Sequence, residues 1–538
     1  MISEVRVRIA HAELAAPRAL ERAAARELGL READVTGVVV TRRSLDARRG
    51  SPSWELRLRV FVGEPASPEP LGGFEPRAVA RAEPVIVVGS GPAGLFAALG
   101  LIAAGLRPVV LERGRDVRGR RFDVARICRE GVVDPDSSYG FGEGGAGTFS
   151  DGKLYTRSTK RGDVRFVLET LVRHGAPRDV LVDAHPHVGT NRLPGVVEAL
   201  RRSIVECGGE VRFETRVVGL LREGSRVSGV EVLPSASAAA DGPVASASER
   251  VHARAVVLAT GHSARDVHAL LRRAGVRIER KPFALGVRVE HPQSVVDAIQ
   301  YHSAVRAPGL PPASYSIVER VGGRGVFSFC MCPGGIVCPA ATAPGEVVVN
   351  GWSPSSRGSR WASSGIVVEI RDEDLAPFAA EEELAGTAFQ ASIERAAFAA
   401  GGGGLHAPAQ RLVDFCEGRD SADLPRSSYR PGLGPADLRA VLPEPIVSLL
   451  RDGLGRIGRR MRGFATDEAV VVAPESRTSS PVRVPRDPES MEHPDVPGLL
   501  PCGEGAGYAG GIVSAALDGL RCAEAAARRL SAGGKTPN

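Results

Sequence analysis

The sequence has few aromatic residues and no long run of like charge. Phe, Trp and Tyr make up 5% of the 538 residues, and 69 basic against 63 acidic residues leave a net charge of +6. Without a basic block, a nucleic-acid-binding arm is disfavoured. The first residues, MISEVRVRIA, lack the apolar core of a signal peptide, so we expect a cytoplasmic protein.

Cysteine is sparse as well, with eight residues scattered along the chain, which is typical of reduced thiols. Three of them, Cys330, Cys332 and Cys338, form a CxCx5C pattern. A metal site needs a fourth ligand and usually a CxxC spacing, so we predict no metal. Two readings stay open for Cys330 and Cys332: direct thiol chemistry, or small residues that line the tight CMCPGG turn.

Residues 85–106 lack charge altogether, and such a run can indicate a membrane span. Three glycines and a proline near its start argue against that interpretation, and we expect no span. The segment 84–112 instead reads as strand, glycine turn, helix and second strand. Gly89 permits the turn, Gly91 permits close approach of a pyrophosphate, and Gly94 permits helix packing. Glu112 follows at the distance of a ribose-binding acid, which predicts dinucleotide binding.

The chain divides into four expected segments. Residues 1–75 predict a small β-α-β-β module and a linker, with a basic loop at residues 42–49 that could bind nucleic acid or phosphate but reads better as a solvated turn. Residues 76–275 form the first part of a dinucleotide-binding domain. We expect an inserted, mixed α+β substrate domain at 276–485 and the rest of the first domain at 486–538.

A second glycine-rich loop, FGEGGAGTFSDGK, spans residues 141–153. Glycines beside hydroxyl groups and a lysine predict backbone laid against a flat or phosphorylated ligand, and a flexible surface loop is the alternative. The small-residue turn at Thr260 and Gly261 follows a strand, where a ligand can reach the carboxyl edge of a sheet. The Ala/Ser-rich residues 234–249 predict a disordered hairpin extension.

The motifs GSGPAG…E, ATG and LLPCGEGAGYAGGI together resemble flavoproteins of the glutathione-reductase type. Within that group, KPFALGVRVEHPQ, FCMCPGG, TSSPVRVPRD and FGEGGAGTFSDGKL are similar to a bacterial family of largely uncharacterised FAD-dependent dehydrogenases. The resemblance covers nearly the whole chain. It implies an α/β fold with a Rossmann-like FAD-binding domain, an inserted α+β domain, and FAD as cofactor.

The resemblance also implies a set of FAD-binding residues. The predicted set is Gly89, Gly91, Pro92, Ala93, Gly94, Glu112, Arg113, Gly144, Gly145, Thr148, Ser150, Val218 (or its neighbour Val217), Thr260, Gly261, Gly503, Glu504, Gly510, Gly511 and Ile512. The last helix would point its N-terminus at the flavin and stabilise the reduced anion. No second complete GxGxxG unit is present, so a separate NAD(P)H domain is not expected.

We therefore expect an FAD-dependent oxidoreductase that transfers hydride between flavin N5 and a small organic substrate, with NAD(P)H as a transient hydride donor. The candidate catalytic residues are Lys153, Cys330, Cys332 and Arg483, and His185, His187 and His262 are candidate proton donors or structural histidines. Two alternatives remain: an NAD(P)H-using flavin monooxygenase, and an RNA-associated flavoprotein that binds through its basic N-terminal module.

Overall fold

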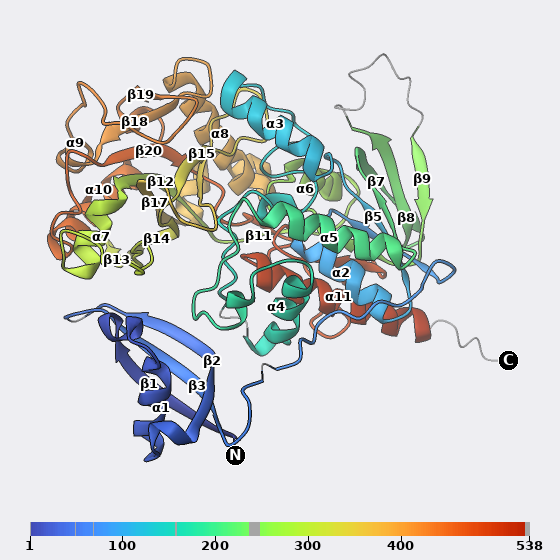
Figure 1. Cartoon of the computed structure of the whole chain (residues 1–538). Helices are drawn as coiled ribbons and strands as arrows, with labels where there is room; N and C mark the ends of the chain where they lie inside the picture. Colours follow the sequence, from blue (N-terminus) through green and yellow to red (C-terminus); the bar gives the residue numbers. More distant parts are fainter. Residues whose placement is uncertain (1, 49, 68, 157–158, 236–247, 533–538) are drawn as a thin grey trace.

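The computed structural model of the protein describes residues 2–48, 50–67, 69–156, 159–235 and 248–532. Most of the Ala/Ser-rich stretch expected to be disordered lies outside these residues. Within the described ranges, no helix is both long enough and apolar enough to cross a membrane. Figure 1 shows three parts: a small N-terminal domain, a central domain, and a third domain built from the middle of the chain.

The central domain is organised around a five-stranded parallel sheet of order β22-β10-β4-β5-β6. Its strands are β4 (Pro84–Val88), β5 (Arg107–Leu111), β6 (Glu210–Arg212), β10 (Val256–Leu258) and β22 (Leu499–Pro501). Because β4 lies in the middle and is covered on both faces, its residues form the continuous apolar run seen in the sequence.

Two layers cover this sheet. Val85 and Val87 face a helical layer made by α2 (Pro92–Ala103), α5 (Leu193–Glu206) and α11 (Ile512–Ala532), with α4 (Val164–Arg173) beside them. Ile86 and Val88 face helix α6 (Arg265–Arg273) and the antiparallel sheet β7-β8-β9. The strands of that sheet are β7 (Thr215–Glu223), β8 (Arg226–Pro234) and β9 (Glu249–His252). Helix α3 (Val117–Glu130) follows β5.

The third domain leaves and re-enters the central domain through two adjacent strands. Strand β11 (Glu279–Arg280) pairs antiparallel with β21 (Val482–Arg483), so the two connections lie side by side. Between them, a seven-stranded sheet has the order β13-β14-β17-β12-β20-β18-β19. Its strands are β12 (Phe283–Pro292), β13 (Val318–Val321), β14 (Arg324–Cys332), β17 (Trp361–Ile370), β18 (Ala407–Arg411), β19 (Leu433–Pro435) and β20 (Val470–Glu475).

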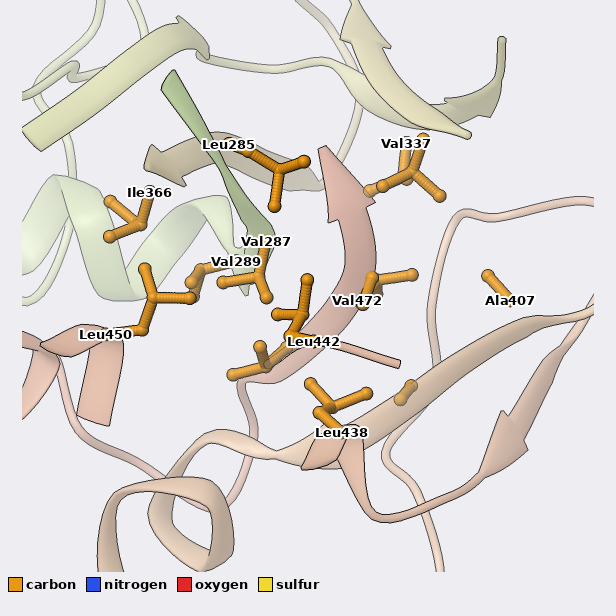
Figure 2. Close-up of a cluster of buried hydrophobic side chains, with 14 of the residues drawn as sticks. Leu285, Val287, Val289, Val337, Ile366, Ala407, Leu438, Leu442, Leu450 and Val472 are labelled. Atoms are coloured by element: carbon orange, nitrogen blue, oxygen red, sulfur yellow. The ribbon is translucent and has the colours of Figure 1, made fainter. Parts of the chain in front are cut away.

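An apolar core joins this sheet to its helices. In Figure 2, Val287 and Val289 of β12 lie close to Ile366 of β17, Val472 of β20 and Leu450 of α10 (Glu444–Arg460). The other elements of the domain are α7 (Gln293–Tyr301), α8 (Ala385–Ala400), α9 (Leu412–Glu417) and the hairpin β15 (Ile336–Pro339) and β16 (Val349–Trp352). Because these branched side chains are buried and closely packed, the third domain is a rigid support for the parts of the protein that border it.

The N-terminal domain has the β-α-β-β order expected from the sequence. Its elements are β1 (Ile2–Ala10), α1 (Ala19–Leu28), β2 (Val35–Asp46) and β3 (Ser53–Val62), and the sheet order is β1-β3-β2. The expected basic loop was placed too early, because residues 42–46 continue strand β2. Arg43 is not solvated either: it pairs with Asp179 and Asp183, and its N–H donates to Val182 O at 2.9 Å. This segment docks the N-terminal domain on the central one; nucleic-acid binding stays an untested prediction.

A buried ionic network fixes the third domain against the central one. Glu394 of α8 is fully buried and accepts hydrogen bonds from Arg265 of α6 and Arg477, each at 2.8 Å. Although burial raises the pKa of Glu394, the Arg477 and Arg265 guanidinium groups dominate and lower it to about 2.

We expect Glu394→Gln to lower the free energy of unfolding at neutral pH by about 3–5 kcal/mol, because the Arg265 and Arg477 guanidinium groups lose one of their two shared carboxylates and retain only Glu346. The pKa of Glu394 is lower in the folded protein than its ordinary value of 4.5. Its ion pairs therefore contribute their full stability above pH 4.5, and this contribution is lost as the pH falls to about 2. The wild type should lose roughly 3 kcal/mol in this window, and the variant should lose less. Denaturant titrations at several pH values test this, with the exposed Glu27→Gln as control. If Glu394→Gln and the wild type lose the same free energy of unfolding as the pH falls, the prediction is contradicted.

Candidate functional site

One cavity of about 430 Å³ lies where the carboxyl ends of the parallel strands face the third domain. It brings together most of the residues singled out from the sequence. Those that line it are Gly89, Gly91, Pro92, Ala93, Glu112, Arg113, Gly145, Ser150, Lys153, Thr260, Gly261, Cys330, Glu504, Gly510, Gly511 and Ile512. The turns after β4 and after β22 therefore border the same space, although they are far apart in sequence.

The other predicted residues lie behind this lining or outside it. Gly94, Gly144, Thr148, Gly503 and Cys332 are buried or half-buried behind the wall, and the Thr148 hydroxyl donates to Glu143 O at 2.7 Å. Val217 lines the cavity in place of Val218, because a β-bulge at this point of β7 shifts the alternation. Arg483 lies outside the cavity: it is exposed on β21, with its guanidinium 5.7 Å from the Tyr508 ring, and its catalytic role stays a prediction.

The turn after β4 requires glycine at specific points. Gly89 has φ +99°, and a Cβ there would lie 2.5 Å from Ala259 O. Gly94 passes so close to Gly89 O that a Cβ would overlap it at 1.9 Å. A Cβ at Gly91 would instead meet only Gly145 Cα, at 3.9 Å, so this glycine keeps the gap between the two glycine-rich loops open. No side chain caps the N-terminus of α2 beside this gap, which leaves N–H groups and a positive dipole end for phosphate oxygens.

Glu112 ties three loops together. Its carboxylate accepts hydrogen bonds from Ser90 N and Oγ at 2.9 and 2.7 Å, from Gly114 N at 2.9 Å, and from Gly142 N at 3.0 Å. Four donors match the acceptor capacity of a carboxylate. Glu112 therefore has a role that the sequence did not indicate, as the joint between the two glycine-rich loops; its contact with a ribose stays a prediction.

Arg120 anchors the backbone at the start of the second glycine-rich loop, residues 141–153. It is fully buried on α3 and donates to Ser138 O at 2.9 Å, Tyr139 O at 2.8 Å and Glu143 O at 2.7 Å. Burial lowers the pKa of Arg120 to about 10, so the guanidinium stays charged at neutral pH. An arginine within a basic helix carries no signal of this role, and sequence analysis missed it.

Lys153 lines the same cavity as Glu112. Its Nζ is 3.2 Å from Asp151 Oδ2, 3.5 Å from Cys332 Sγ and 3.7 Å from Cys330 Sγ. Burial opposes the charge, but the two sulfurs and Asp151 dominate and raise the pKa of Lys153 above its ordinary value of 10.5. The ammonium therefore stays charged at neutral pH.

Several buried polar atoms around Lys153 have no hydrogen-bond partner in the described part of the chain. They include Oδ1 of Asp151, whose residue is 1% exposed, and Nε2 of His187. His187 lies beside Lys153 in an isolated β-bridge, and burial lowers its pKa. His262 lines the cavity and lies 3.2 Å from Glu504, whereas the His185 ring lies tilted against the Tyr155 ring, at 50° and 5.0 Å between centroids. Orphaned polar groups beside a cavity fit a site that binds a polar ligand.

A second group of potential metal ligands lies elsewhere in the fold. Ligand atoms of Cys502, Asp518 and Cys522 come within 4.8 Å of one another. Asp518 already binds Arg486 at 2.6 Å and accepts from Gly503 N at 2.7 Å. The guanidinium supplies positive charge where a metal ion would sit, so this cluster is a structural joint between the end of β22 and the middle of α11.

Comparisons with known proteins agree with this geometry. An FAD binding domain model matches residues 84–126 and 145–351, and a model described as FAD-dependent protein, C-terminal domain-like, matches 282–478. Residues 1–61 match a domain of unknown function. An uncharacterized protein of Clostridium beijerinckii is 37% identical over 526 residues, covering 94% of this chain and 95% of that protein.

Among solved structures, similarity is distant. A geranylgeranyl bacteriochlorophyll reductase-like protein of Thermoplasma acidophilum is 14% identical, with 85% of this chain and 81% of that one covered and a TM-score of 0.34. The quinol fumarate reductase subunit FrdA of E. coli is 13% identical, with 85% and 72% covered and the same TM-score, 0.34.

The matched domains and the glycine-lined cavity define the class: an FAD-dependent oxidoreductase with a Rossmann-like FAD-binding domain. The chain belongs to the same largely uncharacterised family of FAD-dependent proteins as its Clostridium beijerinckii relative. The open gap at Gly91 and the uncapped α2 N-terminus fit the pyrophosphate of this cofactor.

We expect Gly91→Val to purify as a folded but colourless protein, because the new side chain fills the gap toward Gly145 without striking other protein atoms. Flavin absorbance per chain and the thermal midpoint are the measurements. Gly195→Val is the matched control, since no atom lies within 4 Å of its added Cβ. A Gly91→Val protein that retains a full complement of FAD would contradict this assignment of the phosphate path.

Proposed function

We propose that this FAD-dependent oxidoreductase is a dehydrogenase or reductase that transfers hydride between flavin N5 and a small organic substrate. FAD, when bound, supplies a two-electron centre that exchanges hydride with the substrate. The observation that carries the proposal is the cluster of Lys153, Asp151 and Cys330 in the wall of the same cavity that the dinucleotide turn borders.

Lys153 is suited to bind negative charge rather than to donate a proton. Its raised pKa keeps the ammonium charged at neutral pH, and Asp151 beside it fixes its position. A carboxylate or a polarised carbonyl oxygen of a substrate is the kind of group that such a fixed cation orients. Asp151 Oδ1, which has no hydrogen-bond partner among the described residues, supplies an acceptor for a substrate hydroxyl or amine.

Two further features support redox chemistry in this cavity. Helix α11 begins at Ile512, which lines the cavity, so its positive dipole end stabilises negative charge there by about 0.3–2 kcal/mol. His262 and Glu504 also line the cavity, and their contact at 3.2 Å makes a pair that can hold or release a proton. Phe329, Cys330 and Cys338 line the same cavity from the third domain.

A stopped-flow screen of metabolite fractions, run without oxygen, tests the proposal. A substrate of the expected kind bleaches the bound flavin and is recovered with two hydrogens fewer, or re-oxidises reduced flavin and gains two. NADH and NADPH are tested separately as donors. Product that carries a new hydroxyl group, formed only with oxygen and NAD(P)H, would contradict the proposal and favour a monooxygenase.

We expect Lys153→Met to keep its FAD but to reduce flavin on the order of 10²-fold more slowly with an anionic or carbonyl substrate, because the fixed charge is lost. The measurements are flavin content and the rate of bleaching. Lys160→Met, at an exposed position, is the matched control. Equal rates of flavin reduction in Lys153→Met and the wild type would show that Lys153 has no role in the reaction.

A further inference from the structure

The end of strand β14 is distorted where it carries two cysteines. Phe329 pairs with Gly365 of β17, the next paired residue is Cys332 with Ser363, and the register shifts between them. Cys330, at this bulge, has φ +47°, a left-handed conformation that non-glycine residues rarely adopt. Such strain persists only where the surroundings hold it, and it often marks a functional site.

The bulge brings both sulfurs to one ammonium group, with Lys153 Nζ 3.7 Å from Cys330 Sγ and 3.5 Å from Cys332 Sγ. The Cys332 thiol donates to the Cys330 backbone oxygen at 3.3 Å. Cys330 is half-buried and lines the cavity, whereas Cys332 is fully buried behind it. The Cys330 sulfur is thus accessible to a small molecule in the cavity, whereas the Cys332 sulfur contacts only neighbouring protein atoms.

The charges around the pair distinguish the two sulfurs. The hydrogen bond from Cys332 lowers the pKa of Cys330 well below its ordinary value, against the effect of burial, and the Lys153 and Arg288 cations lower it further. The same hydrogen bond and burial raise the pKa of Cys332. These opposite directions favour Cys330 as the more acidic sulfur and Cys332 as the one that keeps its proton.

The other cysteines outside the central domain lack this setting. Burial raises the pKa of Cys338, and it raises the pKa of Cys416 to about 11. These two are inert thiols, and they serve as internal references for the reactivity of the pair.

We propose that Cys330 and Cys332 form a redox-active dithiol in the cavity wall, with Cys330 as the attacking sulfur, Cys332 as the resolving sulfur and Lys153 as the counter-ion. A small organic disulfide is the oxidant. The Cys330 thiolate attacks one of its sulfurs, the bond between its two sulfurs breaks, and the released thiolate takes a proton. Cys332 then loses its proton, attacks the Cys330 sulfur and expels the second thiolate. Two protein thiols become one disulfide, and one small disulfide becomes two thiols.

The dithiol is independent of the hydride-transfer function proposed above. The experiment treats the purified full chain with 2-hydroxyethyl disulfide, blocks free thiols with an alkylating reagent under denaturing conditions, and sequences the cysteine peptides by mass spectrometry. We expect residues 330–332 to resist alkylation and to be two hydrogens lighter, with Cys338 and Cys416 alkylated. Residues 330–332 that alkylate as fully as Cys338 and Cys416 would overturn the proposal.

Single variants assign the two sulfurs. Cys332→Ser should accumulate the mixed disulfide on Cys330, whereas Cys330→Ser should leave Cys332 unmodified. Cys338→Ser, the matched control, should form the disulfide as the wild type does. Adding Lys153→Met to Cys332→Ser should slow formation of the mixed disulfide about tenfold or more, because the thiolate loses its counter-ion. Reaction first at Cys332, or an unchanged rate without Lys153, would contradict these roles.

The same assay on Gly91→Val separates this proposal from the function proposed above. If hydride transfer fails in every substrate screen while the disulfide still forms at residues 330–332, the dithiol proposal holds and the hydride-transfer proposal fails. Disulfide formation in a colourless protein also shows that the reaction needs the small disulfide alone.

Discussion

The close packing of helices α2 and α11 is the constraint on which the cavity depends. A Cβ at Gly519 of α11 would lie 2.1 Å from Ala93 O, and one at Gly100 of α2 would lie 2.8 Å from Ala523 Cβ. Each glycine allows the partner backbone to approach at van der Waals distance. Because both helices begin at the cavity, this packing sets how far apart the two cofactor-binding turns lie.

Buried charged side chains then fix the loops next to the N-termini of the two helices. Glu112 joins the first glycine turn to the second glycine-rich loop, and Arg120 holds that loop by three backbone carbonyls. At the other turn, Asp518 accepts from Gly503 N and binds Arg486. These charges are costly to bury and are retained where each hydrogen-bonding group is matched, which positions the backbone for a ligand.

The sequence predicted the parts of the fold that depend on local pattern. The 84–112 unit, the last helix and the N-terminal β-α-β-β order follow from apolar periodicity and from glycines at fixed spacing. The contacts of Lys153 with Cys330 and Cys332 could not be predicted, because they join loops of two domains that only the folded chain brings together. Arg483 lies outside the cavity because it is on the exposed domain connection, and of the two neighbours Val217 and Val218 it is Val217 that lines the cavity. The sheet order β12-β20-β18 is likewise set by long-range packing.

The third domain gives the site its chemical character. The central domain supplies glycine backbone and helix ends, which suit a dinucleotide, and β14 brings the two sulfurs that lie next to Lys153. A crystal structure of the purified protein with its flavin is the most direct test of this account. The account predicts a single FAD that contacts both the 89–94 turn and the 503–512 turn, with Lys153 and Cys330 near its redox-active end. FAD held by one of these turns alone, or outside the cavity between them, would contradict it.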